Sequence, residues 1–230
     1  MKIDLSKYLD DWYKEDSAKK IFPGPVITIS REAGCPAKTI AADLEQSLNK
    51  LKSTKAKPHP WRWLSKEMMQ DFAKEFNVDY SHIDDVFKFK KRSVLEDILL
   101  AQSTQYYTSD FKVRATIAKV IRTFANKGNA IIVGRGGVAI TRDIPKSLHI
   151  QLEAPLEWRA LRISEKYDVS IEHARQYTKQ VDKKRIKFRD SFQGQGTDYT
   201  RFDMTFNCMT LNIQEIEKII IGALKVREMI

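Results

Sequence analysis

Cysteine is scarce in this chain, and long apolar runs are missing. The 230 residues include two cysteines, Cys35 and Cys208, too few for a disulfide framework and without the spacing of a zinc site. No stretch reaches the roughly 18 apolar residues needed to cross a bilayer, and the first residues contain no apolar run typical of a signal peptide. We therefore expect a cytoplasmic protein without a membrane partner.

Acidic residues are outnumbered by basic ones, and the formal net charge is +10. A basic balance attracts phosphate-rich partners, either nucleotides or nucleic acid. We find no helix-turn-helix, zinc or RNA-recognition motif, so nucleic acid is not the expected partner. If the charge served nucleic acid, affinity would fall steeply with salt. The positions of the arginines must therefore distinguish a nucleotide partner from a nucleic acid partner.

Short apolar strands alternate with helices along the chain, after a lead-in over residues 1–22 and a break at Pro23-Gly24-Pro25. This alternation predicts one α/β domain, 23–230, with a parallel sheet covered by helices on both faces. The long helical stretch between the first two strands is interpreted as an insertion. The expected strands are 26–30, 130–134, 147–152 and 202–207, and the expected helices include 37–51, 111–127, 156–167, 170–192 and 213–230.

The first loop, SREAGCPAKTIA (30–41), joins a buried strand to a helix. Loop amides and a helix N-terminus at such a place can hold a phosphate. The full phosphate-loop pattern is GxxxxGK[ST]. Lys38-Thr39 match its end, but Glu32 and Ala37 occupy the two glycine positions. An ordinary strand-to-helix turn, with Lys38 exposed, explains the loop equally well.

A second loop, VGRGG (133–137), directly follows the second expected strand. An arginine at the carboxyl end of a parallel strand points into the crevice where such sheets bind ligands. Arg135 can hold a phosphate there through two parallel hydrogen bonds. The alternative is a tight turn with a solvated arginine, and we favour the interpretation that Arg135 binds a phosphate.

Two basic helices complete the candidate site. Arg159 and Arg162 lie three residues apart on one helical face. In the next helix Asp182, Arg185 and Arg189 share a face, and Asp182 can hold one of these arginines in place. Such a pair of helices can close over a polyphosphate, since phosphoryl transfer needs cations around the transferred group. A solvated basic surface is the alternative.

In this order, the segments resemble the cytidylate kinase-like family from about Val26 to the C-terminus. The resemblance implies a P-loop NTPase-like nucleoside monophosphate kinase architecture, with a helical insertion on the monophosphate side over about 52–128 and a lid over about 155–196. The matching segments are ITISREAGCPAKTIA, DFKVRATIAKVIRTFANKGNAIIVGRGG, LHIQLEAPLEWRALRI, VDKKRIKFRDSF and FDMTFNCMTLNIQEIEKII.

The resemblance also implies ATP-dependent phosphoryl transfer to a nucleoside monophosphate, with CMP or dCMP expected, and Mg²⁺ bridging the phosphates. Arg114 and Arg135 match arginines that bind the monophosphate. The lid positions that face ATP and the transferred group are matched by Arg159, Arg162, Asp182 and Arg185. The loop around the ATP phosphates is matched by Gly34, Cys35, Pro36, Ala37, Lys38 and Thr39, and no residue is assigned as a metal ligand.

Two places depart from the family pattern. Pro36 and Ala37 replace a glycine pair, and Ser65 stands where an aspartate is common. In the register fixed by Ile40-Ala41, Ala37 takes the place of the phosphate-loop lysine, whereas the simple motif gives that place to Lys38. The alternative function is therefore a nucleotide-binding sensor of the same fold with weak or no turnover.

Overall fold

Five parallel strands form the sheet of this protein, whose computed structural model describes residues 24–51, 59–75, 111–192 and 201–230. The strand order is β2-β3-β1-β4-β5. The strands are β1 (Val26–Arg31), β2 (Arg62–Leu64), β3 (Ala130–Val133), β4 (Ser147–Glu153) and β5 (Met204–Asn207). This arrangement confirms the predicted α/β fold with a parallel sheet.

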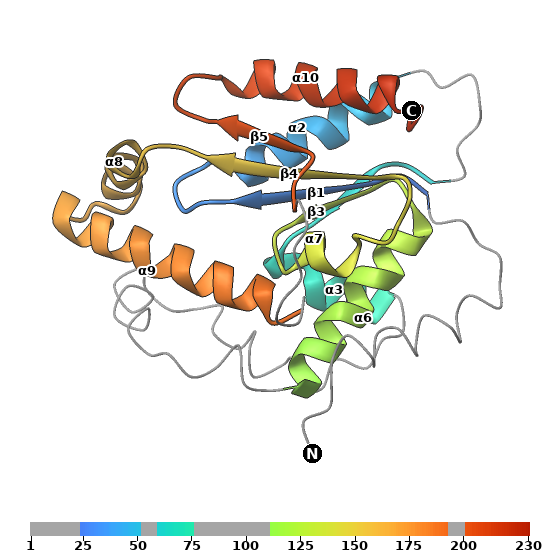
Figure 1. Cartoon of the computed structure of the whole chain (residues 1–230), viewed down its shortest axis with the longest axis horizontal. Helices are drawn as coiled ribbons and strands as arrows, with labels where there is room; N and C mark the ends of the chain where they lie inside the picture. The colour runs from blue at the N-terminus through green and yellow to red at the C-terminus, as the bar shows by residue number, and fades with distance from the viewer. Residues whose placement is uncertain (1–23, 52–58, 76–110, 193–200) are drawn as a thin grey trace.

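Strand β1 lies at the centre and is buried from Val26 to Ile29 because helices cover both faces of the sheet (Figure 1). Its Ile29 is aligned with Val133 of β3 and with Ile150 of β4. The sequence pattern predicts four strands, and β2 is the one it misses. The reason is local: β2 has three residues, of which Leu64 is buried and Arg62 is exposed, so it carries no apolar run.

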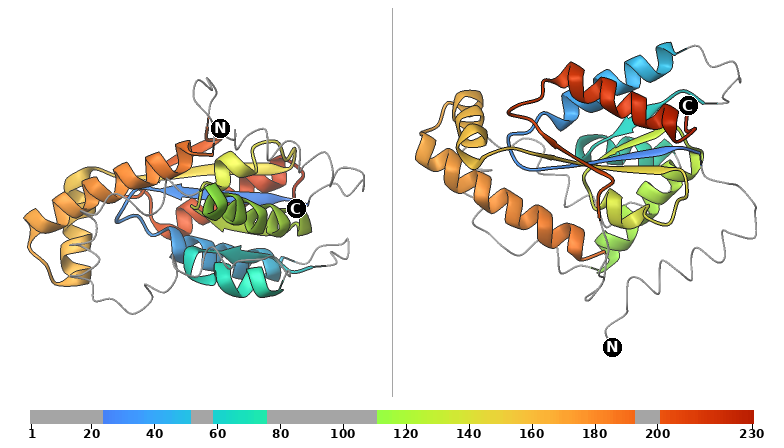
Figure 2. Two further views of the ribbon diagram at one scale, coloured as in Figure 1. Left: turned by 90° about the horizontal axis from the view of Figure 1, so that it is seen from below. Right: turned by 45° about the horizontal axis from the view of Figure 1, so that its top comes forward.

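Two helical layers sandwich the sheet (Figures 1 and 2). Helices α2 (Ala37–Lys50) and α10 (Ile213–Val226) pack on one face against Ile27, Ile29 and their neighbours. Helices α3 (Met69–Glu75), α6 (Phe111–Lys127) and α7 (Gly137–Ile140) cover the other face, and the short 3₁₀ helix η1 (Lys66–Met68) precedes α3. Alternate side chains of β1 thus pack into two separate hydrophobic cores, one on each face of the sheet.

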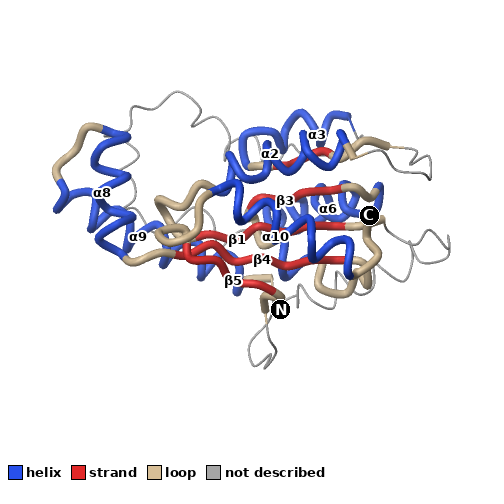
Figure 3. Tube along the Cα trace, turned by 90° about the horizontal axis from the view of Figure 1, so that it is seen from above, coloured by secondary structure: helices blue, strands red, loops and turns tan. Residues whose placement is uncertain are grey.

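A helical hairpin, α8 (Leu156–Tyr167) and α9 (Ile171–Asp190), stands at the carboxyl ends of the strands (Figures 1 and 3). Ser170 accepts a hydrogen bond from the amide of His173 at 3.3 Å and caps the N-terminus of α9. Phe188 and Phe192 at the far end of α9 are buried in the core beside α6. The hairpin is therefore fixed at this end.

Several sequence predictions lie outside the described residues: the lead-in 1–22, the parts of the insertion at 52–58 and 76–110, and the end of the expected lid at 193–196. The four-residue helix α7 is not predicted by the sequence pattern. Among the helices that the structure describes, none combines the length and apolar character needed to cross a membrane.

Candidate functional site

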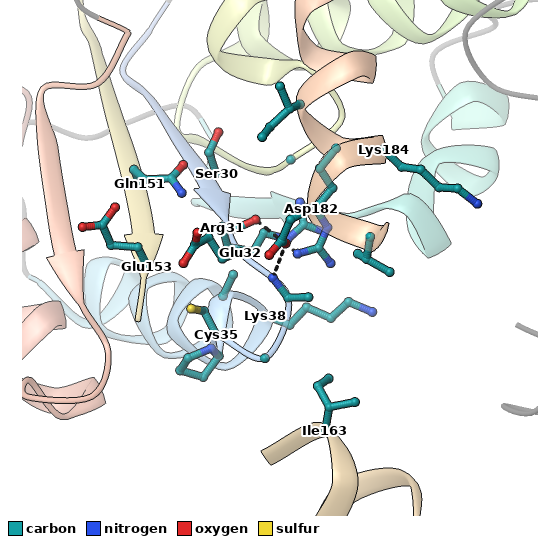
Figure 4. Close-up of a pocket in the computed structure, with 18 of the residues that line it drawn as sticks. Ser30, Arg31, Glu32, Cys35, Lys38, Gln151, Glu153, Ile163, Asp182 and Lys184 are labelled. Carbon is teal, nitrogen blue, oxygen red and sulfur yellow. Dashed lines mark hydrogen bonds between the residues drawn. The ribbon is translucent and has the colours of Figure 1, made fainter. Parts of the chain in front are cut away.

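A cleft of about 1770 Å³ opens at the carboxyl ends of the strands. It lies between the first loop, the turn after β3 and the helical hairpin, the place where open α/β sheets bind ligands. Basic side chains outnumber acidic ones in its lining. Figure 4 shows Arg31, Lys38 and Asp182 gathered near the end of β1, with Ile163 across the opening on α8. The cleft therefore suits an anionic ligand.

The first loop joins β1 to the start of α2 and presents free amides to this cleft. Of the amides from Gly34 to Ala37 that the sequence singles out, Pro36 has no N–H, and those of Cys35 and Ala37 bond to nearby loop carbonyls. Within the described residues, no hydrogen bond involves the amides of Gly34, Lys38 and Thr39. These three lie at a helix N-terminus, so they are the donors available to a phosphate.

Gly34 is required by the loop's close approach to α8. Its φ is +93°, and a Cβ placed there would lie 2.9 Å from the Arg159 carbonyl oxygen. A larger residue would be strained and would push the loop away from the hairpin. This contact sets the distance between the free amides of the loop and α8.

Arg159 is buried beneath the first loop and does not line the cleft. Its Nη1 lies 2.6 Å from Asp182 Oδ2 and donates to the Ala33 carbonyl at 3.2 Å. Its Nε donates to the Ala154 carbonyl at 2.7 Å and lies 3.1 Å from a Glu32 oxygen. Arg159 thus connects α8 to the first loop and to Asp182, and its expected contact with ATP stays a prediction.

Asp182 lines the cleft and holds this arrangement from α9. Besides binding Arg159, it accepts a hydrogen bond from the Ala33 amide at 2.7 Å. The expectation that Asp182 fixes one of the lid arginines is confirmed. The first loop, α8 and α9 are therefore tied together by one carboxylate.

The other lid arginines do reach the cleft. Arg162 is exposed; its guanidinium carbon lies 4.6 Å from the Trp158 ring centroid, and its Nε donates to the Gly34 carbonyl at 3.4 Å. Arg185 is half-buried and donates from Nη1 to the Arg31 carbonyl at 3.1 Å. Both cations therefore sit on the loop that is expected to hold the phosphates.

The two arginines expected to bind the monophosphate are placed differently. Arg135 lines the cleft, whereas Arg114 lies near the start of α6 and is not among the lining residues. Arg135 has a φ of 57° between Gly134 and Gly136, which also have positive φ. A non-glycine residue in this region is uncommon and frequently marks a functional turn. Its guanidinium carbon lies 5.6 Å from the centroid of the Phe188 ring, so the side chain packs on α9.

Arg31 is a site residue that the sequence analysis misses. Its guanidinium lies directly against Gly134: a Cβ there would be 1.7 Å from Nη1. Burial, followed by the charges of Arg185 and Arg135, lowers the pKa of Arg31 to about 9, while Glu67 acts in the opposite direction. Its position at the end of a buried strand could have identified Arg31 from the sequence, because the same position identifies Arg135.

Lys38 points from the first turn of α2 to Glu67 of η1, at 2.8 Å. Ser65 donates to the other oxygen of Glu67 at 2.6 Å. Burial of Glu67 opposes ionisation, but the hydrogen bonds from Lys38 and Ser65 prevail and lower the pKa of Glu67 to about 2. Ser65, which stands where the family often has an aspartate, thus orients a carboxylate at the edge of the cleft.

A loop of free amides at a helix start, an arginine turn on the next strand and a helical hairpin define an α/β protein with a nucleotide kinase-like fold. The chain belongs to the cytidylate kinase-like family, whose model matches residues 26–210.

One solved structure agrees with this fold. The chain is similar to the crystal structure of an uncharacterized protein from Eubacterium ventriosum, with a TM-score of 0.61, 19% identity, and coverage of 88% of this chain and 98% of that one. A shikimate kinase from Acinetobacter baumannii in complex with shikimate gives a TM-score of 0.47 and 11% identity, with coverage of 91% and 98%. No curated protein matches the chain significantly.

Proposed function

We propose that the protein transfers the γ-phosphoryl group of ATP to a nucleoside monophosphate, with CMP or dCMP as the expected acceptor. The observation that carries this proposal is the convergence of Arg31, Arg135 and Arg185 at the strand ends. Neighbouring guanidinium groups repel each other, and burial strengthens the repulsion. A phosphate-rich ligand would offset it with charged, bidentate hydrogen bonds.

The parts of the cleft would divide the work between the two nucleotides. The amides of Gly34, Lys38 and Thr39 at the start of α2 would receive the ATP phosphates. Arg135 would bind the monophosphate, as would Arg114 on the strength of the family resemblance alone. Arg162 and Arg185 would neutralise charge on the transferred group as the hairpin closes and excludes water. The protein thereby contributes positioning and charge.

Magnesium is expected to arrive with ATP and to neutralise charge between its phosphates. The described residues contain no cluster of three or more potential metal ligands. Mg²⁺ needs only one or two carboxylates beside substrate phosphates and water. Glu67 on the cleft wall is ionised at neutral pH because its pKa is held near 2. This donor fits such an ion.

A nucleotide sensor of the same fold is the second candidate. The observation that favours it is Ala37, which occupies the lysine place in one register and, as the first residue of α2, is buried in the core. Such a loop can bind phosphates through its backbone without accelerating their transfer. A sensor would bind nucleotide without forming ADP.

One experiment separates the two functions. A coupled assay would follow ADP release from ATP and Mg²⁺ in the presence of each ribo- and deoxyribonucleoside monophosphate, with calorimetry on the same samples. ADP release that depends on one monophosphate supports the kinase. Binding without release supports the sensor, and absence of both contradicts the proposal.

A further inference from the structure

We propose that Arg31 provides the positive charge on the transferred phosphoryl group that the lysine provides in a complete phosphate loop. This inference rests on the proposed function. Four observations support it: the absence of a suitable lysine, the seat of the Arg31 side chain, its charged neighbours and its position between the two expected nucleotide sites.

No lysine is well placed on the first loop for this task. In a complete phosphate loop the lysine reaches the β- and γ-phosphates. Here Ala37, in one of the two possible registers, is 2% exposed and packs with Ile40 and Leu44 in the core. In the other register Lys38 is engaged by Glu67 at 2.8 Å. A cation at the strand end would therefore come from another residue.

Arg31 begins the same loop and reaches across the end of the sheet. Its guanidinium occupies the space that a side chain at residue 134 would fill. Within the part of the chain that the structure describes, the guanidinium donates no hydrogen bond and forms no ion pair. Its donors are therefore available to an anion, and a guanidinium can bind two phosphate oxygens at once.

The position of Arg31 lies between the two expected nucleotide sites. On one side are the free amides at the start of α2, and on the other is Arg135, whose charge acts on Arg31. Arg185 from the lid donates to the carbonyl of Arg31 itself, which brings a third cation to the same point. A group transferred from ATP to the monophosphate must pass between these two sites.

The chemical step needs no proton transfer to Arg31. The bond between the γ-phosphorus and the β,γ-bridging oxygen breaks, and a bond forms from the γ-phosphorus to an oxygen of the monophosphate. That oxygen is already ionised at neutral pH, because the second pKa of a phosphate monoester is about 6. Arg31 remains a guanidinium and stabilises the charge on the transferred group.

Arg31→Gln, with Arg31→Lys as the conservative variant, tests the inference. We expect the glutamine variant to lose about 100-fold or more in kcat, the range for removing one transition-state donor, with a much smaller change in the KM for the monophosphate. The lysine variant should recover part of this loss because it restores the charge but not the bidentate geometry. Arg142→Gln, an exposed arginine outside the cleft, is the matched control.

Gly134→Ala is a second variant, which keeps the charge of Arg31 but displaces its guanidinium. The added Cβ meets the flexible end of Arg31, so the guanidinium must leave its seat. We expect a loss of kcat similar to that of Arg31→Gln, with circular dichroism confirming the fold. Wild-type kcat in the folded glutamine variant would overturn the inference.

If the wild-type protein does not turn over, a binding measurement tests the contact between Arg31 and phosphate. Calorimetry with inorganic triphosphate should show at least tenfold weaker binding to Arg31→Gln and unchanged binding to Arg142→Gln. If the wild type binds triphosphate but makes no ADP, the proposed function fails while the Arg31 phosphate contact stands. Equal triphosphate affinity in wild type and Arg31→Gln, or no triphosphate binding by the wild type, would overturn the Arg31 contact.

Discussion

Arg159 and Asp182 form a largely buried ion pair, with Nη1 and Oδ2 2.6 Å apart. Because the second oxygen of Asp182 accepts the Ala33 amide, this pair joins α8, α9 and the first loop. Removing one partner of a buried ion pair leaves the other charge uncompensated. The lid and the loop therefore depend on the same contact.

Asp182→Ala is expected to destabilise the protein by about 3 kcal/mol, the lower part of the range for breaking a buried ion pair. Arg159 keeps its carbonyl contacts, which limits the loss. Urea unfolding followed by circular dichroism measures the change. Glu165→Ala, on the exposed side of α8, is the control. A change within about 0.5 kcal/mol, as for most surface substitutions, would mean that the pair is not structural.

Arg135→Ala is expected to weaken monophosphate binding without unfolding the chain. A bidentate contact between arginine and phosphate contributes about 1.5–3 kcal/mol, which corresponds to roughly tenfold to hundredfold in KM. Steady-state kinetics with varied monophosphate measures this effect, with the melting temperature as a control for folding. An unchanged KM for the monophosphate would remove Arg135 from the site.

Lys38→Ala is expected to change ATP affinity by no more than about 0.5 kcal/mol. The side chain is exposed and engaged with Glu67, and pairs of this kind contribute little. Calorimetric titration with ATP decides between the two registers of the loop. A large loss of ATP affinity at an unchanged melting temperature would show that Lys38 is the phosphate-loop lysine.

Glu67 should make stability depend on pH in acid. Its pKa falls from the ordinary value of 4.5 to about 2 on folding, so its stabilising contribution is fully present above about 4.5 and is lost as pH falls through about 2. The difference in melting temperature between wild type and Glu67→Gln should therefore shrink over this range. A difference that stays constant from pH 6 to pH 2 contradicts the assignment.

Arg31→Gln should raise the melting temperature of the ligand-free protein. Burial and the two neighbouring arginines disfavour the charge of Arg31, so its removal relieves repulsion. A gain of about 1 kcal/mol corresponds to about 2–4 °C for a domain of this size. Differential scanning calorimetry without nucleotide measures the shift. A lower melting temperature would show that Arg31 serves the fold instead of a ligand.

The sequence predicts the fold better than it predicts the site. Strands such as β1 and helices such as α10 have strong periodic patterns, which reflect burial against neighbours. The sequence pattern does not predict strand β2, because β2 is a strand through its pairing with β3 and not through its own composition. In the site, Arg135 and Asp182 follow from position in the chain.

The roles of Arg159 and Arg31 depend on side-chain direction, which spacing does not specify. Arg159 shares a helical face with Arg162, yet it turns under the loop because Asp182 lies there. Arg31 finds its place because Gly134, 103 positions along the chain, has no side chain. A contact of this kind appears only when the strands are assembled.

ADP formation by the full chain with ATP, Mg²⁺ and each monophosphate in turn separates a kinase from a sensor. We expect ADP release that depends on the monophosphate, is fastest with CMP or dCMP, and falls about 100-fold or more in Arg31→Gln. Folded protein that binds nucleotide in calorimetry but releases no ADP with any monophosphate would contradict the kinase and leave the sensor.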